Sequence, residues 1–230
     1  MPACNFLMRA NDYHVDRLET LEVRRYGKAQ RHHLGWAGAE RVDPLCLETA
    51  AEIWTTRGIL PFALQVVSDA ELPEEACLTT YDGSKIVVKI AQHIRHKALM
   101  GDGLARFTIA CELGHATLHL DALTEEPIPY SRWAEDRSGM RGSVFCSARW
   151  QARIFAAAFL IHDDTAWTLP TFDEVSVRYG IAWLAAKNYL ALTQHAIQRA
   201  QDRELDGEFG QEMSSTRSAL YRPSHILPPR

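Results

Sequence analysis

The chain has 230 residues, of which 47% are hydrophobic and 23% are charged, a composition that excludes a wholly disordered protein. Its 25 Lys and Arg residues against 29 Asp and Glu residues give a net charge of −4, which argues against a dedicated nucleic-acid-binding protein. The longest apolar runs, such as 155–161, are too short to span a bilayer, and the first residues lack the pattern of a secretory signal.

The cysteines are five in number, lie far apart and form no CxxC pair (Cys4, Cys46, Cys77, Cys111 and Cys146). An odd number at such spacings does not indicate a disulfide framework. Because no export signal is evident, we expect reduced thiols in a cytoplasmic protein, most of them acting as small buried apolar residues.

The first predicted elements are helical. Residues 1–40 are polar and mixed, and the segment 16–25 (DRLETLEVRR) predicts a short charged helix. Apolar residues at helical spacing predict a second helix over 45–57, and Gly58 is expected to end it.

The period then changes to that of a small sheet. Three short runs rich in β-branched residues are bounded by Pro or by Asp-Gly, at 59–67, 76–80 and 85–90. The dipeptide Asp82-Gly83 between the last two runs is typical of a hairpin, so we expect an antiparallel unit here.

Helices return in the second half of the chain. We expect one helix over 104–120 and another over 147–161, separated by an irregular polar loop at 121–146. Segment 171–200 predicts two more helices, broken at Tyr179-Gly180. The order of elements indicates a compact α+β domain with late helical additions.

The motif of most chemical interest lies in the first of these helices. Cys111-Glu112-Leu113-Gly114-His115 differs by one residue from HExxH. In that motif two histidines on one helix face bind zinc, and the Glu activates the metal-bound water. A third protein ligand comes from elsewhere, and the fourth position stays open for water and substrate.

The sequence around the motif resembles the ImmA/IrrE family of zincin-like metallopeptidases. ARFTIACELGHATLHL (105–120) resembles the family's RFTLAHELGHLLLH, and RWQARIFAAAFLI (149–161) resembles its EWQANxFAAALLMP. The run 69–90 is similar to the family's strand region, and 177–190 is similar to its helical end, so that the resemblance covers roughly 45–195.

The resemblance implies a fold and a domain organisation. The fold would be an α+β, zincin-like (minimal gluzincin) domain, with a small, mostly antiparallel sheet packed on the motif helix and further helices at the C-terminal end. We expect an N-terminal helical extension at 1–40, the zincin-like domain with its helical end at 41–200, and a weakly packed tail at 201–230.

The departures from the family pattern imply a degenerate metal site. Aligned on the family, the first zinc histidine falls on Cys111, the glutamate base on Glu112 and the second histidine on His115. The third ligand, a glutamate, falls on Arg149, and a guanidinium offers no lone pair to a metal. His119 recurs in the family without ligating. We therefore expect no bound metal, with Glu112 a remnant base and with Cys111, His115, Arg149 and His119 shaping the site.

Three hypotheses about the altered site are open to test. An arginine at the vacated ligand position is expected to pair with Glu112, since a buried carboxylate needs a partner or a proton. Alternatively, Cys146 lies one turn before Arg149 and would complete a Cys₂His zinc site with Cys111 and His115. A further alternative is a cysteine–histidine hydrolase built on Cys111 and His115.

The family implies a role in gene regulation. Its active members resemble proteases that cleave a helix-turn-helix repressor and release genes of a mobile element or a stress response. A degenerate site favours a pseudoprotease that holds such a protein partner against an edge strand, in 76–80 or 85–90, without cutting it. The alternative is an active metallo-endopeptidase with the Cys/His ligand set. We expect no membrane partner, and we expect 177–190, which also resembles a helix-turn-helix, to pack on the core rather than bind DNA.

Overall fold

The computed structural model describes residues 12–38, 41–43, 45–58, 62–72, 77–124 and 143–205. The chain divides into a first compact unit, Met1–Leu190, and a second unit, Ala191–Arg230. The first unit is an α+β structure, as the sequence predicts, with a small sheet and several helices. Among the described residues, every helix is too short or too polar to cross a membrane.

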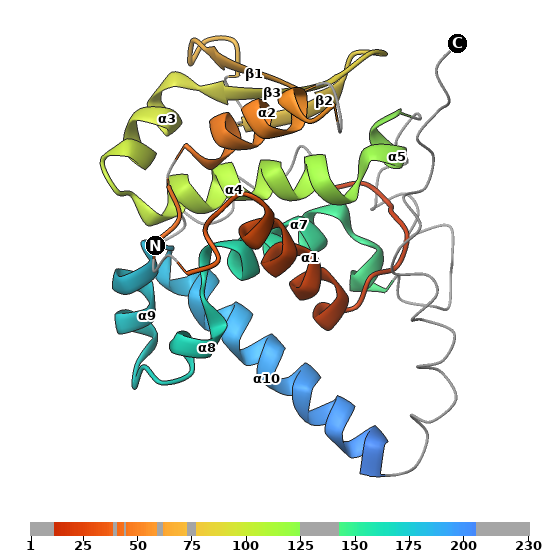
Figure 1. Ribbon diagram of the computed structural model, residues 1–230, viewed down its shortest axis with the longest axis vertical. Helices are drawn as coiled ribbons and strands as arrows, with labels where there is room; N and C mark the ends of the chain where they lie inside the picture. Colours follow the sequence, from red (N-terminus) through yellow and green to blue (C-terminus); the bar gives the residue numbers. More distant parts are fainter. Residues whose placement is uncertain are drawn as a thin grey trace. The chain divides into compact units, whose positions relative to one another are not determined.

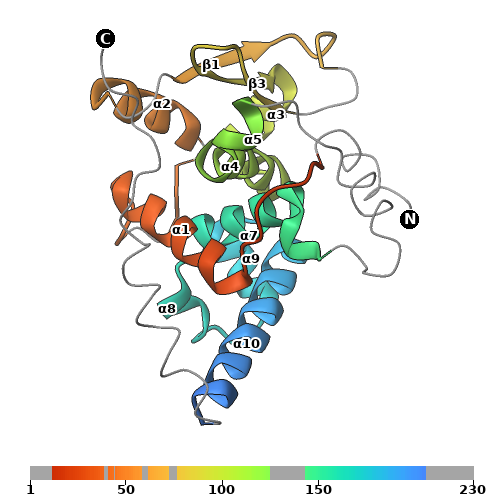
Figure 2. The same ribbon diagram turned by 90° about the vertical axis from the view of Figure 1, so that its right-hand side faces the viewer.

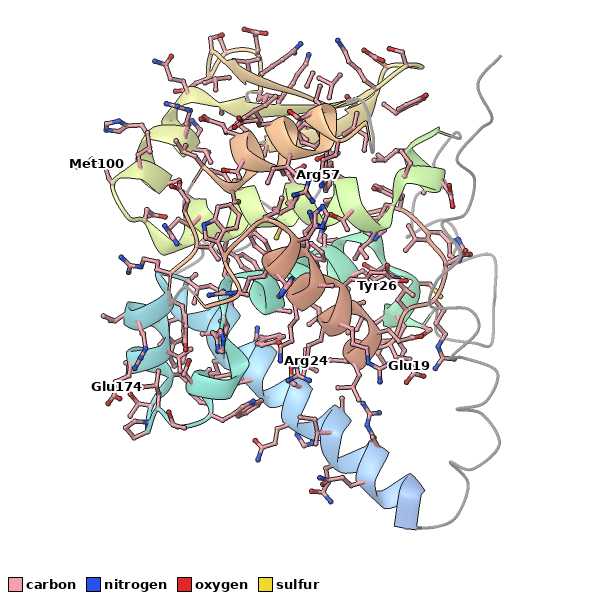
Figure 3. The ribbon with its side chains drawn as sticks, viewed as in Figure 1. Glu19, Arg24, Tyr26, Arg57, Met100 and Glu174 are labelled. Carbon is pink, nitrogen blue, oxygen red and sulfur yellow. The ribbon has the colours of Figure 1, made fainter. Side chains whose placement is uncertain are left out.

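The helices and strands of the first half follow the predicted order, with one addition. They are α1 (Thr20–His33), α2 (Cys46–Thr56), β1 (Phe62–Val67), β2 (Cys77–Tyr81), β3 (Ile86–Ala91) and α3 (Gln92–Leu99). α1 begins later than predicted because Glu19 and Glu22 form a capping box at its start. Figure 3 labels Glu19 at this end of the helix. α3 was not predicted from the sequence, because it is a polar helix whose buried residues are Ile94 and Ala98.

The sheet is mixed, with the strand order β1-β3-β2. β2 and β3 pair antiparallel around Asp82-Gly83, which confirms the predicted hairpin. β1 pairs parallel with β3, so the expectation of a mostly antiparallel sheet is wrong. The hairpin occupies one side of β3, and β1 takes the other side. β3 is therefore the central strand, which excludes 85–90 as an edge and leaves β2 as the edge strand of the hairpin.

In the second half, four described helices appear where the sequence predicts them: α4 (Gly103–Leu118), α7 (Ala148–Leu160), α9 (Phe172–Tyr179) and α10 (Trp183–Leu205). Two short helices, α5 (Leu120–Thr124) and α8 (Asp163–Ala166), were not predicted, and a 3₁₀ turn, η1 (Val144–Cys146), precedes α7. α9 ends at Gly180, whose φ of 59° is left-handed, as the predicted break requires.

Parts of the loop and tail predictions cannot be compared with the structure. The predicted loop 121–146 contains most of α5 at its start and η1 at its end. Its residues 125–142 lie outside the described residues, as does the chain from 206 onward, which includes most of the predicted tail.

α4 is the central helix of the first unit. It lies beneath the sheet, α7 packs on its other side, and α1 packs on α7 (Figures 1 and 2). Two glycines allow these close approaches. A Cβ on Gly114 would lie 3.1 Å from Cα of Ala152 in α7, and one on Gly27 of α1 would lie 2.8 Å from Cβ of Ala158. The glycine of the CELGH motif thus serves helix packing, and α1 belongs to the same compact unit as the motif helix.

Candidate functional site

The motif side chains lie on α4, where this helix passes between β2 and α7. Glu112 and His115 are each 6% exposed, and His119, directly after the helix, is 2% exposed. Cys111 is partly buried and packs against the hydrophobic core. The structure therefore brings four of the predicted site residues into the interior around one helix.

Glu112 is held by the edge strand. The hydroxyl of Thr79 in β2 donates to Oε2 of Glu112 at 2.6 Å and lies 3.4 Å from the backbone oxygen of the same residue. Thr79 is itself buried. A charge-assisted bond of this length positions the carboxylate firmly. Sequence reasoning missed Thr79, because a threonine in a predicted strand carries no signal for such a contact.

The thiols near Glu112 keep their protons. Burial raises the pKa of Cys111, and the negative charge of Glu112 raises it further, while Arg153 opposes the shift. Burial and then Glu112 likewise raise the pKa of Cys77, which lies in β2. Since the thiolate is the nucleophile and the metal ligand, Cys111 has the chemistry of a small apolar residue here.

On the other side, His115 belongs to a hydrogen-bonded chain that we call the imidazole chain: Tyr13, His115, His119 and Gln151. The hydroxyl of Tyr13 lies 3.1 Å from Nδ1 of His115, and this nitrogen lies 3.1 Å from Nδ1 of His119. Nε2 of His119 lies 3.0 Å from Oε1 of Gln151. All four residues are buried.

Both imidazoles are neutral at pH 7. Burial, then the proximity of His119, then that of Arg149 lower the pKa of His115 well below its usual value. Burial lowers the pKa of His119 to about 4, against a smaller opposing effect of its hydrogen bond to Gln151. Burial also raises the pKa of Tyr13, so its phenol keeps its proton.

Tyr13 reaches the site because the segment that precedes α1 runs along the start of α7 (Figures 1 and 2). The amide of Ala148 donates to the carbonyl of Tyr13, and the amide of Val15 donates to the carbonyl of Cys146. Sequence reasoning placed this segment in an extension and missed Tyr13. It also missed Gln151, although Gln151 lies within the WQA that resembles the family.

Arg149 has a different partner from the one predicted. Oδ1 of Asp12 accepts the backbone N–H of Arg149 at 3.2 Å and the hydroxyl of Ser147 at 2.7 Å. Burial lowers the pKa of Arg149, while the charge of Asp12 opposes that shift. In the part of the chain that the structure describes, no ion pair joins Arg149 to Glu112. The N-terminal segment brings Asp12 to the start of α7, where it accepts the backbone N–H of Arg149 and its charge acts on the guanidinium.

The described residues contain no group of three His, Cys, Asp or Glu side chains placed to hold a metal ion. The alternative ligand set of Cys111, His115 and Cys146 is therefore not assembled among them. Cys146 lies buried in η1, where its carbonyl accepts the amide of Val15.

Comparisons with known proteins add no assignment: a scan of protein-family models found no match, and neither did searches of curated proteins and of solved structures.

Proposed function

We propose that this chain is an ImmA/IrrE-like pseudoprotease with a zincin-like domain, which binds a protein partner in the cytoplasm without cleaving it. The partner class is a helix-turn-helix repressor or a related regulator, in gene regulation of a mobile element or a stress response. The proposal rests on the sequence resemblance and on the chemistry of the residues at the motif.

The main observation that supports this proposal is how the motif residues are bonded and protonated. Glu112 is engaged by Thr79, Cys111 keeps its proton, and His115 uses Nδ1 within the imidazole chain. A glutamate base in a metallopeptidase acts on water whose pKa a metal has lowered. The ligand position that the family fills with glutamate holds Arg149, whose side chain cannot bind a metal. These features support binding over hydrolysis.

An edge strand next to the motif supports a peptide-binding mode. β2 pairs with β3 on one side, and among the described strands none pairs with its other side. Its Thr79 also contacts Glu112 on α4. An extended peptide that adds to such an edge is recognised through backbone hydrogen bonds, which need neither a metal nor a general base.

The test uses the full chain and a helix-turn-helix repressor encoded beside its gene. We expect calorimetry to detect binding, and mass spectrometry to find the repressor intact after incubation. Glu112→Gln should bind as the unchanged protein does. Glu71→Gln is the matched control, because Glu71 is exposed and bonds Ser68 outside the site.

Two results would overturn the proposal. Cleavage of the repressor that disappears in Glu112→Gln but persists in Glu71→Gln would establish the metallo-endopeptidase alternative. Absence of binding by the unchanged protein would reject this partner class.

A further inference from the structure

The end of the imidazole chain has one possible orientation. The side-chain nitrogen of Gln151 lies 2.7 Å from the carbonyl oxygen of Asp16 and 2.6 Å from that of Phe145. A carbonyl oxygen accepts hydrogen bonds and cannot donate, so the NH₂ group of Gln151 must face both oxygens. Oε1 of Gln151 therefore faces His119.

This orientation decides where the hydrogen of His119 lies. Oε1 of Gln151 can only accept, so Nε2 of His119, 3.0 Å away, must carry the hydrogen of that bond. His119 is 2% exposed, and within the described residues its hydrogen-bond partners are the amide of Gln151 and the ring of His115 rather than a carboxylate. Such a ring is neutral and carries one hydrogen, so Nδ1 of His119 has a bare lone pair.

The same reasoning then applies to His115. Its Nδ1 lies 3.1 Å from the bare Nδ1 of His119, and two lone pairs at that distance would repel each other. The hydrogen between the two nitrogens must therefore belong to His115. The oxygen of Tyr13, 3.1 Å from the same nitrogen, can share this hydrogen as a second acceptor.

We infer that Gln151, acting through His119, holds His115 in the tautomer protonated at Nδ1 and so leaves Nε2 of His115 as a fixed hydrogen-bond acceptor. Gln151 and His119 are positioning residues in this arrangement. Their effect passes through three side chains and begins at two backbone carbonyls, those of Asp16 and Phe145, which belong to segments that precede α1 and α7.

Nε2 of His115 is the free end of the imidazole chain. Within the described residues, the hydrogen bonds of His115 run through Nδ1, which leaves Nε2 as the ring nitrogen available to a ligand. A ligand group that matches it is a hydrogen-bond donor, such as a peptide N–H, whereas a carboxylate would be repelled. This choice of ligand rests on the proposed function, while the tautomer does not.

Nuclear magnetic resonance tests the tautomer in the full chain without any partner. Long-range proton–nitrogen correlation on protein labelled with ¹⁵N-histidine distinguishes a protonated ring nitrogen from a bare one, and a His115→Gln spectrum assigns the His115 signals. We expect Nδ1 in the protonated region and Nε2 in the unprotonated region at pH 7. The opposite pattern would overturn the inference.

Matched variants test how the tautomer is held. His119→Phe removes the acceptor but keeps a ring, so Nδ1 of His115 should then accept from the hydroxyl of Tyr13 and the two nitrogen signals should exchange regions. Tyr13→Phe removes the other partner and should leave the signals in place. Gln151→Met should give a mixture of both tautomers.

The variants also show when the inference fails. Exchange of the two signals in Tyr13→Phe, or unchanged signals in His119→Phe with a dispersed amide spectrum, would refute the role of His119. If His119→Phe does not fold, the unchanged protein and Tyr13→Phe still decide the tautomer. A correct tautomer together with no repressor binding would refute the proposed function alone.

Discussion

α4 presents different chemistry toward its two neighbours, α7 and β2. Toward α7, the imidazole chain links side chains from three segments and ends on backbone carbonyls. Toward β2, Glu112 meets Thr79 beside the protonated thiols of Cys77 and Cys111. His115 thus belongs to a hydrogen-bonded chain of several side chains, whereas the contact of Glu112 with Thr79 involves one neighbouring strand. Removing a buried side chain that bonds several partners leaves each of those partners without its hydrogen bond, whereas removing one hydroxyl donor affects one acceptor group.

The largest expected effect is on the side of α7. Gln151 is 0% exposed and bonds His119 and two carbonyls. Gln151→Met keeps much of the side-chain volume but leaves those three buried partners without a hydrogen bond, at a cost of roughly 1–3 kcal/mol for each. We expect the free energy of unfolding in urea to fall by about 4 kcal/mol.

Gln92→Met is the matched control, because Gln92 is exposed at the start of α3. It should change the free energy of unfolding by less than about 0.5 kcal/mol. Equal losses for the two variants would contradict the contrast between the two sides of α4.

Sequence reasoning succeeded where local signals decide the structure. Apolar spacing placed α2, α4 and α7, and Asp82-Gly83 placed the hairpin. It failed on the partner of β1, because parallel pairing with β3 depends on which edge the hairpin leaves open. The sequence therefore predicted the positions of the strands but not how all of them pair.

The same division holds at the site. The motif and its family resemblance identified Glu112, His115 and His119 as residues of one site. Their partners Tyr13 and Thr79 come from segments 102 and 33 positions away in sequence. No local pattern marks such a residue. The predicted pairing of Arg149 with Glu112 was wrong for a similar reason, because Asp12, whose charge acts on Arg149, lies outside 45–195, the range that the resemblance covers.

Acidification should weaken the fold through the same imidazole chain. Burial lowers the folded-state pKa of His115 and brings that of His119 to about 4, both below the ordinary value near 6.5. Between these pKa values, the unfolded chain therefore binds more protons than the folded protein does. The stability due to these neutral rings is complete above pH 6.5 and is lost as the pH falls toward about 4. His119 alone should contribute about 3 kcal/mol to that loss.

Urea unfolding at several pH values measures this loss. His119→Phe should flatten the decline between pH 6.5 and 4.5. His96→Gln, which changes an exposed residue of α3, should follow the unchanged protein. A decline of equal slope in His119→Phe would show that other groups cause the acid sensitivity.

A smaller effect is expected on the side of β2. Thr79→Val removes the hydroxyl that donates to Glu112 and leaves the strand residue β-branched. The buried carboxylate loses one donor, so the free energy of unfolding should fall by about 2 kcal/mol. Thr80→Val is the control on the same strand: its hydroxyl bonds the carbonyl of Val87 at 3.3 Å in a partly buried position, and its loss should cost about 0.5 kcal/mol. A larger loss of stability in Thr80→Val than in Thr79→Val would show that the contact with Glu112 is the less important of the two.

The smallest effect is a reaction rate that should stay near zero. Burial, with the charge of Glu112, raises the pKa of Cys111, so almost none of this thiol is thiolate at pH 7. In the folded protein, iodoacetamide should label Cys111 no faster than Cys77, which is 5% exposed and whose pKa burial also raises. Peptide mass spectrometry against time gives both rates, and urea-unfolded protein, in which both thiols are accessible, gives the reference. Rapid labelling of Cys111 in the folded chain, abolished by His115→Gln, would reveal a thiolate paired with His115. That result would support the cysteine–histidine hydrolase, because the raised pKa of Cys111 predicts an unreactive thiol beside Glu112.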